Sequence, residues 1–289
     1  MGSPRFGPAG IPERFRGPLP EFPAFLRAEG LDAFEYQGTR WGPKPQIRHE
    51  EAVALGRRAS EKDVLLTIHA SYFINLSGET PIVMASKRRL LAAVEAASWM
   101  GAKAVVFHLG YYGRRSPKEA LGLCRKSLRE VLEEMEARGI RAVCLRPETA
   151  GKTFQLGSLD EILLLSQSLD SVKPTIDWSH IHARARGSLR TKEDYVRVLE
   201  VIEKSLGSEA LKDLHFHFTK VEFGRTGERS HRSLEDPRSG PEFGPLAAVV
   251  FEMGLEPVFI CESPLLDLDA KRMRKMYEDA GAPEASGIK

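Results

Sequence analysis

VLLTIHASY, residues 64–72, decides the fold, because it is an apolar run that ends in a histidine, His69. Five more segments share this design and end in a histidine or a carboxylate: AVVFHLG (104–110), VCLRPETAG (143–151), PTIDWSHIH (174–182), LHFHFTK (214–220) and VFICESP (258–264). Seven of the eight histidines lie in these segments or at His231. Imidazole and carboxylate groups are the ligands that Zn²⁺, Mn²⁺ and related ions use in proteins. The sequence therefore predicts a metalloenzyme.

The six segments are spaced like the units of an alternating strand and helix fold. Each step from His69 to Glu262 is about one strand, one helix and two loops long. Apolar residues at helical spacing fill the intervals, as in 121–135 and 195–206. Ser116 and Ser158 are each followed three residues later by a glutamate, which is typical of a capping box at the start of a helix.

Eight segments are predicted strands of a parallel sheet. Runs such as VLLTI and PVFIC are apolar without alternation, which is typical of strands buried on both faces. The eight are Arg5–Gly7, Asp32–Tyr36, Val64–Ile68, Ala104–Phe107, Arg141–Leu145, Pro174–Ile176, Leu214–Phe218 and Pro257–Cys261. They predict an α/β protein of the (β/α)8 TIM-barrel class, whose active site lies at the C-terminal strand ends. An open doubly wound sheet is the alternative, but it does not explain polar residues at six successive strand ends.

The composition predicts one globular domain over residues 1–289. A chain with 42% hydrophobic residues can bury a full core, and no linker or repeat divides it. No apolar stretch approaches the ~20 residues that span a bilayer, and the N-terminal MGSPRFGPAGIPERF lacks the apolar region of a signal peptide. Three cysteines are too few for a disulfide framework. We therefore expect a cytoplasmic monomer that does not interact with membranes.

Short motifs with metal-binding residues follow one another in a set order. The first is HASYFINL, from His69 to Leu76. The later ones are His108, Asp177-x-x-His180, His215-x-x-x-x-Lys220 and Glu262-x-Pro264. Together they resemble the endonuclease IV family of apurinic/apyrimidinic (AP) endonucleases, within the xylose-isomerase-like TIM barrels, where the first motif reads His-x-x-Tyr-Leu-Ile-Asn-Leu. The resemblance runs from about residue 31 to residue 276.

The resemblance implies a cluster of two or three zinc ions. His69 and His108 are expected to bind the first ion, and Glu148 is expected to bridge it to the second and to be essential for catalysis. The second ion is expected to be completed from three later strand ends, by Asp177, His215 and Glu262. In the family a third ion is held by the histidine of Asp-x-x-His, here His180, and by an Asp-x-His pair in the loop after the seventh strand.

The sequence departs from the family at two of these positions. Arg229 stands where the aspartate of the Asp-x-His pair is expected, with Glu228 one residue earlier and His231 in place. We expect Glu228 to reach the third ion, since a loop can bring a longer side chain to it; the alternative is a site with two ions. Glu148 lies in Pro-Glu-Thr-Ala-Gly, where the family reads Glu-Asn-Thr-Ala-Gly. As the only carboxylate at that strand end, it remains the predicted bridge.

The resemblance further implies that the protein binds double-stranded DNA with an abasic site. In the family, two loops enter the duplex at the lesion. Here these loops hold Gln37 and Arg40 after the second strand, and Tyr72 and Phe73 after the third. Unstacking a base step costs a few kcal/mol, and least where pairing is already lost. The predicted reaction is hydrolysis of the phosphodiester 5′ to the abasic site in base excision repair.

Two other functions remain open at this stage. A metal-dependent sugar isomerase or epimerase of the same superfamily is expected to have a mostly carboxylate metal site and a closed, sugar-sized pocket. A non-catalytic DNA- or metal-binding relative is the second alternative. His182 and His217 each lie two residues beyond a better ligand, so supporting or core roles are predicted for both. Arginines after the strand ends, Arg184 among them, favour a DNA-binding rim.

Overall fold

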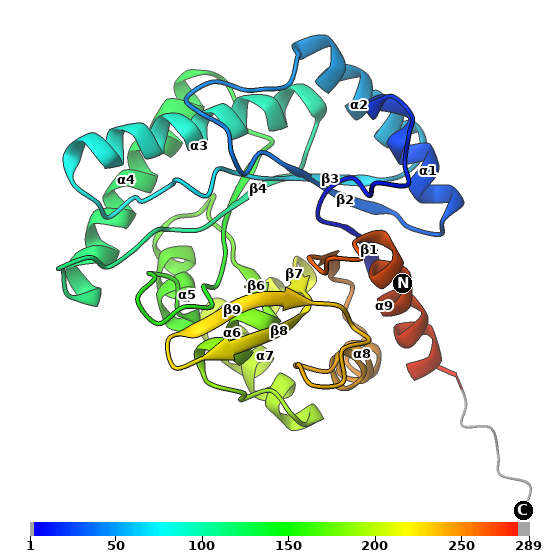
Figure 1. The fold of residues 1–289 in the computed structure, drawn as a ribbon. Helices are drawn as coiled ribbons and strands as arrows, with labels where there is room; N and C mark the ends of the chain where they lie inside the picture. The colour runs from blue at the N-terminus through cyan, green and yellow to red at the C-terminus, as the bar shows by residue number, and fades with distance from the viewer. Residues whose placement is uncertain (1–2, 283–289) are drawn as a thin grey trace, which may run out of the picture.

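The computed structural model describes residues 3–282, and a closed barrel of parallel strands lies at its centre (Figure 1). One half of the barrel has the order β1 (Arg5–Pro8), β10 (Val258–Cys261), β7 (His215–Phe218) and β6 (Thr175–Asp177). The other half has the order β2 (Ala33–Gln37), β3 (Leu65–His69), β4 (Ala104–Phe107) and β5 (Cys144–Pro147). Parallel bridges from Ala9 to Glu35 and from Glu148 to Thr175 join the two halves. The predicted TIM-barrel class is confirmed.

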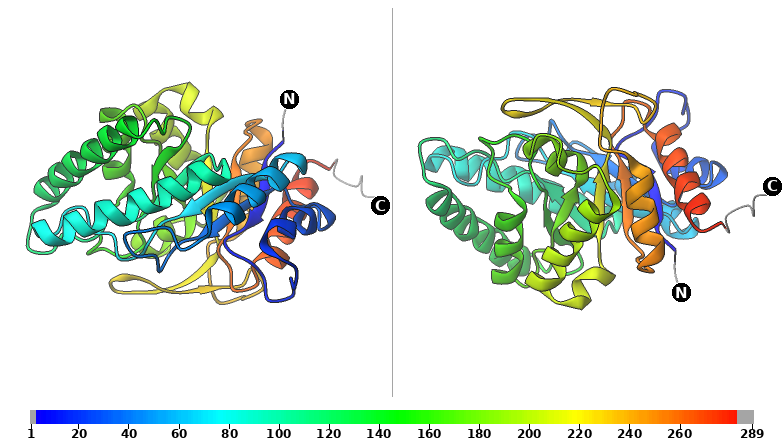
Figure 2. Two further views of the ribbon diagram at one scale, coloured as in Figure 1. Left: turned by 90° about the horizontal axis from the view of Figure 1, so that it is seen from above. Right: turned by 90° about the horizontal axis from the view of Figure 1, so that it is seen from below.

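The helices form a layer around the outside of the barrel (Figure 2). They are α1 (Phe22–Ala28), α2 (His49–Glu61), α3 (Thr80–Met100), α4 (Pro117–Ala137), α5 (Leu159–Ser168), α6 (Trp178–Arg184), α7 (Lys192–Leu206), α8 (Phe243–Glu252) and α9 (Asp267–Ala280), with short 3-10 turns η1 (Leu19–Glu21) and η2 (Ser208–Lys212). Both predicted capping boxes are present, at Ser116 of α4 and Ser158 of α5. Within residues 3–282 no helix is long and apolar enough to cross a membrane.

All eight predicted strands are present, with their ends displaced by at most three residues. The largest displacement is at β5, which begins at Cys144 rather than at Arg141. Arg146 lies inside this strand because its guanidinium is paired: it donates a hydrogen bond of 2.9 Å to the carbonyl of Pro174 and forms an ion pair with Asp213. A buried charge with both partners in place does not break a strand.

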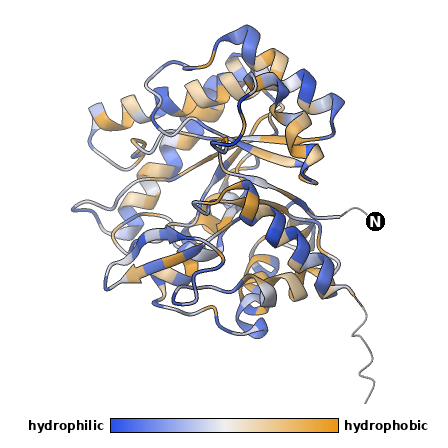
Figure 3. Ribbon diagram, turned by 45° about the vertical axis from the view of Figure 1, so that its right-hand side comes forward, coloured by the Kyte–Doolittle hydropathy of each residue, from blue (hydrophilic) through white to orange (hydrophobic). Residues whose placement is uncertain are grey.

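Apolar side chains of the strands pack against the inner faces of the helices. Figure 3 shows hydrophobic colour on the central strands and both hydrophobic and hydrophilic stretches along the outer helices. One packing contact bears on function: Trp178, at the start of α6, lies with its ring centre 5.2 Å from that of Tyr195 and 5.1 Å from that of Phe216. Such ring pairs add about 0.5–1.5 kcal/mol each beyond burial. They fix α6, which carries His180, against α7 and β7.

A hairpin of β8 (Lys220–Gly224) and β9 (Gly227–Arg232) projects from the barrel where a loop was predicted. Its strands contain many charged residues, so the alternation of apolar and polar side chains that predicts a strand is not visible in the sequence. The turn ends at Gly227, whose φ is +100° and whose backbone lies against the carbonyl of Gly151. A side chain there would both strain the backbone and collide with that carbonyl. The hairpin holds Glu228 and His231 over the C-terminal end of the barrel.

Candidate metal centre

Histidine and carboxylate side chains gather at the C-terminal ends of the barrel strands. Three groups of their ligand-type atoms lie at these strand ends, and within each group the atoms lie within 4.8 Å of one another; a fourth such group, Glu35, His215 and His217, lies deeper in the barrel. The first group is His69, His108 and Glu148; the second is Glu148, Asp177, His217 and Glu262; the third is His180, Glu228 and His231. Parallel strands about 4.8 Å apart explain the gathering, because residues at consecutive strand ends become neighbours.

The first group is built around one carboxylate oxygen of Glu148. Nε2 of His69 lies 3.2 Å from Oε2 of Glu148, and Nε2 of His108 lies 3.5 Å from the same oxygen. The second oxygen, Oε1, lies 3.1 Å from Nδ1 of His180 and 3.4 Å from Nδ1 of His217. Glu148 therefore lies between the first and second groups, in the position expected of a bridging carboxylate.

The second group contains His217 where His215 was predicted. Nδ1 of His217 lies 3.3 Å from Oε1 of Glu262, whereas His215 does not belong to this group. Both histidines lie on β7 and share a face because they are two residues apart. His217 is nearer the C-terminal end of the strand, and His215 lies one layer deeper in the barrel. The geometry places His217, and not the predicted His215, beside Asp177 and Glu262, while His215 lies in a group with Glu35 and His217.

Asp177 enters the second group through one oxygen only. Its Oδ1 accepts a hydrogen bond of 2.6 Å from the backbone N–H of His180 and caps α6. Its Oδ2 is buried and has no hydrogen-bond partner within residues 3–282. An N-terminal cap of this kind fixes the carboxylate rotamer, so Oδ2 is held in one direction, toward the group.

The third group joins α6 to the β8–β9 hairpin. Oε2 of Glu228 lies 3.3 Å from Nε2 of His180, and Oε1 of Glu228 lies 3.4 Å from Nε2 of His231. Gly151 makes room for this approach, since a Cβ there would lie 2.7 Å from the His180 ring and 2.8 Å from Cβ of Glu228. Arg229, which takes the aspartate position of the family pattern, points away and lies 3.8 Å from Glu222.

Four of the histidine rings have a hydrogen-bond acceptor next to one ring nitrogen. Nδ1 of His69, His180 and His231 lies 2.8, 2.9 and 3.0 Å from the carbonyls of Ala70, Thr149 and Glu262. A carbonyl oxygen only accepts, so these nitrogens carry the proton. Their Nε2 atoms face Glu148 or Glu228, and Nδ1 of His180 also lies 3.1 Å from Oε1 of Glu148. In His217 the arrangement is reversed, with Nε2 held 3.2 Å from Oε2 of Glu35 and Nδ1 facing the group.

Burial and crowding move the pKa values of these side chains in opposite directions. Burial raises the pKa of Asp177 to about 6 and lowers the pKa of His108 to about 4. Burial also opposes ionisation of His231, but its hydrogen bond to Glu228 raises its pKa to about 9. The pKa of Glu148 is held well below its usual range by the neighbouring histidines, although burial acts against this. Carboxylates packed this closely repel one another, and positive charge between them favours their ionised forms.

The donor set fits divalent cations. Imidazole and carboxylate donors are those that Zn²⁺ uses, and each group offers at least three. Several buried atoms in the groups find no hydrogen-bond partner in the part of the chain that the structure describes: Glu148 Oε1, Asp177 Oδ2, His217 Nδ1 and His108 Nδ1. Burying such atoms without a partner costs about 1–3 kcal/mol each, and a bound cation removes that cost for the ligand atoms.

The predicted DNA-contacting residues surround the mouth of the barrel. Tyr72 and Phe73 are 55% and 63% exposed, and the Tyr72 ring lies against His69 and His108 with centre distances of 5.4 and 6.2 Å. The backbone N–H of Tyr72 donates to the carbonyl of Thr39, which brings Gln37, the last residue of β2, and exposed Arg40, in the loop that follows, beside the loop after β3. A cavity of about 340 Å³ opens here, lined by residues of the first and third groups and by Tyr72.

Three of the arginines after the strand ends are paired within the protein, whereas Arg114, Arg186, Arg190, Arg225 and Arg229 are exposed. Arg184 donates to the carbonyls of Lys152 and Gln155 and so ties the loop after β5 to α6. Arg232 pairs with Glu222 across the hairpin, and Arg115 pairs with Glu79. These contacts make Arg184 a structural residue. His182 is structural as well, because its Nδ1 accepts a 3.1 Å hydrogen bond from Leu189 N–H.

One buried residue of the centre escaped the sequence analysis. Glu35 lies in β2 with no exposed surface, and its carboxylate contacts Thr67 and His217. The sequence AFEYQ, 33–37, did carry a signal, because a glutamate in the middle of an otherwise apolar strand needs a partner when it is buried. The HFH pattern of β7 carried a second signal, because alternate residues of a strand share a face and both histidines therefore point to the same side.

Comparison with known proteins places the chain in a family. The family described as xylose isomerase-like TIM barrel matches residues 23–280. The chain belongs to this family. An uncharacterized protein of Methanocaldococcus jannaschii is 34% identical over 277 residues, which cover 95% of this chain and 97% of that protein. Endonuclease 4 of Thermus thermophilus is 25% identical over 228 residues, which cover 73% of this chain and 80% of that enzyme.

Solved structures share the barrel but come from two kinds of enzyme. Endonuclease IV from Thermus thermophilus matches with a TM-score of 0.67 and 21% identity, over 96% of this chain and 98% of that one. The 3-keto-D-glucoside 4-epimerase from E. coli matches with a TM-score of 0.65 and 15% identity, over 96% of this chain and 100% of that one. At these identities the likeness shows the fold alone, and one fold supports many chemistries.

Proposed function

We propose that the protein is a zinc-dependent AP endonuclease, which hydrolyses the DNA backbone 5′ to an abasic site. The observation that carries the proposal is the joining of three histidine and carboxylate groups, two of them through Glu148. The residues that would hold the ions are His69, His108, Glu148, Asp177, His217, Glu262, His180, Glu228 and His231. The order of their motifs along the chain supports the nuclease, and so does the sequence similarity to endonuclease 4.

In this proposal the chain binds the DNA and holds the scissile phosphate at the carboxyl ends of the strands. The three groups would hold the zinc ions, which when bound would activate water near neutral pH and offset charge on the leaving oxygen. Tyr72 and Phe73 are exposed, and the Tyr72 ring lies beside His69 and His108; in the proposed complex both side chains enter the duplex where a base is missing. Gln37 and Arg40, on the neighbouring loop, contact the same strand. Glu148 keeps the first and second groups at a constant separation.

A sugar epimerase is the second candidate, and the cavity at the mouth favours it. A volume of about 340 Å³ is within the range of small-molecule sites, and the epimerase structure matches nearly as well as the nuclease structure. The donor set favours the nuclease. The three groups contain five histidines, and two of these, in the third group, are additional to the ligands that a single-ion site needs. Exposed Tyr72 and Phe73 have no evident role on a free sugar.

One experiment separates the candidates. The zinc-loaded full chain is incubated with a duplex that contains a single tetrahydrofuran abasic analogue and with an intact duplex of the same sequence. Cleavage confined to the abasic strand, with a 3′-hydroxyl on the upstream fragment, supports the proposal. Absence of cleavage together with epimerisation of a ketose by the Mn²⁺- or Co²⁺-loaded protein would support the epimerase. Metal binding with neither activity indicates a non-catalytic relative.

A further inference from the structure

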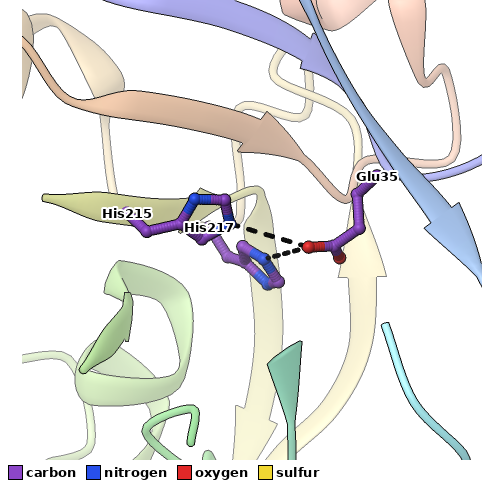
Figure 4. Close-up of side chains that lie close together, drawn as sticks. All are labelled: Glu35, His215 and His217. Carbon is purple, nitrogen blue, oxygen red and sulfur yellow. Dashed lines mark hydrogen bonds and ion pairs between the residues drawn. The ribbon is translucent and has the colours of Figure 1, made fainter. Parts of the chain in front are cut away.

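Glu35 lies below the second group with its carboxylate inside the barrel. It is fully buried on β2 and accepts a hydrogen bond of 3.0 Å from the hydroxyl of Thr67 on β3. Its Oε2 lies 3.2 Å from Nε2 of His217 and 3.6 Å from Nε2 of His215. Figure 4 shows both rings approaching this oxygen from β7. A buried carboxylate is costly unless its partners are well placed, so these contacts call for a functional explanation.

His217 presents Nδ1 to the carboxylates of the second group and has a side-chain acceptor, Glu35, on its other nitrogen. Nδ1 of His217 faces Glu148 and Glu262 at 3.4 and 3.3 Å. A ring that gives Nδ1 to a cation carries its proton on Nε2, and that proton needs an acceptor. For the rings held by backbone carbonyls, the main chain supplies the acceptor. At His217 the acceptor is the Glu35 side chain.

We propose that Glu35 is a positioning residue for His217: its carboxylate accepts the Nε2–H proton, sets the tautomer and holds Nδ1 toward the second group. The negative charge of Glu35 also makes the ring a stronger donor to a cation. Thr67 fixes the rotamer of Glu35 from the neighbouring strand. Such outer partners change metal affinity by about 10–100-fold. The inference rests on the proposed function only in requiring an ion in the second group, and it requires no reaction on DNA.

A separate metal site formed by Glu35, His215 and His217 is the competing explanation, since these three also lie within reach of one ion. It conflicts with the use of Nδ1 of His217 in the second group. An ion on each nitrogen would require the ring to lose both protons, whereas a neutral imidazole keeps one. The positioning role uses the same contacts and leaves the ring neutral.

The test measures zinc affinity and zinc content of the full chain, with Zn²⁺ alone as the probe, in competition with a chromophoric chelator. Glu35→Leu removes the acceptor, and we expect the affinity for one ion to fall 10–100-fold. Glu35→Gln keeps an acceptor oxygen without the charge, and its affinity should fall between those of the wild type and Glu35→Leu. His215→Gln is the matched control and should bind zinc as the wild type does. Unchanged affinity in Glu35→Leu, or loss of one ion in His215→Gln, would overturn the proposal.

A second measurement covers the case in which Glu35→Leu does not fold. Imidazole ¹⁵N NMR of the zinc-loaded wild type should show a proton on Nε2 of His217, and Glu35→Gln should keep it; a proton on Nδ1 in either protein overturns the proposal. Failure of the positioning role and failure of the proposed function look different. If substitution of Glu35 lowers the zinc affinity but the wild type does not cut abasic DNA, only the nuclease function fails. If abasic DNA is cut and substitution of Glu35 leaves the zinc affinity unchanged, only the positioning role fails.

Discussion

Glu228 places its Oε2 3.3 Å from Nε2 of His180, although the first residue lies on the β8–β9 hairpin and the second in α6. Its other oxygen lies 3.4 Å from Nε2 of His231. Glu228 therefore contacts both histidines of the third group, although it stands one residue before the position at which the sequence pattern predicts an aspartate. Phe223 of β8 pairs with Glu228 and Glu222 pairs with Ser230, so Arg229 is the extra residue of a β-bulge, and Glu228 and His231 can face the same side although they are three residues apart.

Removal of Glu228 tests the third group. Glu228→Ala should lose one zinc ion per chain, because His180 and His231 then lack a carboxylate between them. Zinc content is measured by elemental analysis after removal of free metal. Arg229→Ala is the matched control: its side chain is 64% exposed and pairs with Glu222, so its zinc content should match that of the wild type. Unchanged content in Glu228→Ala would mean that the centre holds two ions.

Glu148→Gln tests the bridge between the first and second groups. The substitution keeps the shape of the side chain and removes its charge. We expect lower zinc occupancy and a fall in abasic-site cleavage of at least about 100-fold, since both Glu148 oxygens face ligand nitrogens. Elemental analysis and single-turnover cleavage assays measure the two effects. Normal cleavage by the variant rules out a bridging role for this carboxylate.

The barrel could be predicted from the sequence because its signals are local. Each strand is a short apolar run, and each capping box lies within four residues. Local sequence could not decide whether His215 or His217 lies beside Asp177 and Glu262. Both share one face of β7, and which of them meets Asp177 and Glu262 depends on the depth of the strand in the barrel. Register against neighbouring strands decides this, and no single segment contains it.

Tyr72 and Phe73 should carry lesion recognition. Replacing both with Ala should weaken binding to an abasic duplex by about 10-fold or more while binding to an intact duplex changes little, because aromatic contacts with bases are worth about 1–3 kcal/mol each. Fluorescence anisotropy at fixed salt measures both affinities. Phe251, 45% exposed on α8, supplies a control: Phe251→Ala should not change the ratio. Equal losses on both duplexes would assign the two residues a general role in DNA contact.

Acid should destabilise the protein through His182. Its Nδ1 accepts a hydrogen bond from Leu189 N–H, and burial lowers its pKa to about 4 from an ordinary 6.5. A lowered pKa means that the stabilisation is complete above pH 6.5 and is lost as the pH falls toward 4. His182 alone should account for roughly 1–3 kcal/mol of this loss. Urea unfolding at about pH 7 and about pH 4.5, with metal chelated in both, measures it.

His182→Asn is the comparison that isolates this effect. An asparagine oxygen can replace Nδ1 as the acceptor for Leu189 and does not titrate. The variant should therefore lose less unfolding free energy between the neutral and the acidic measurement than the wild type. If both proteins lose the same amount, the acid sensitivity comes from other groups, such as buried His215, whose pKa burial also lowers to about 4.

Gly151 should be as important to the third group as the ligands themselves. A Cβ at this position would lie 2.7 Å from the His180 ring and 2.8 Å from Cβ of Glu228, closer than packed carbon atoms can approach. Gly151→Ala should push these side chains apart and lower the affinity for one zinc ion while the other ions stay bound. Zinc titration measures this directly.

The matched control is Gly122→Ala on α4, where a Cβ would meet no atom within 4 Å in the described part of the chain. This variant should keep full zinc content and gain up to about 1 kcal/mol of stability, because alanine favours a helix. Full zinc content with unchanged affinity in Gly151→Ala would show that His180 and Glu228 do not share an ion.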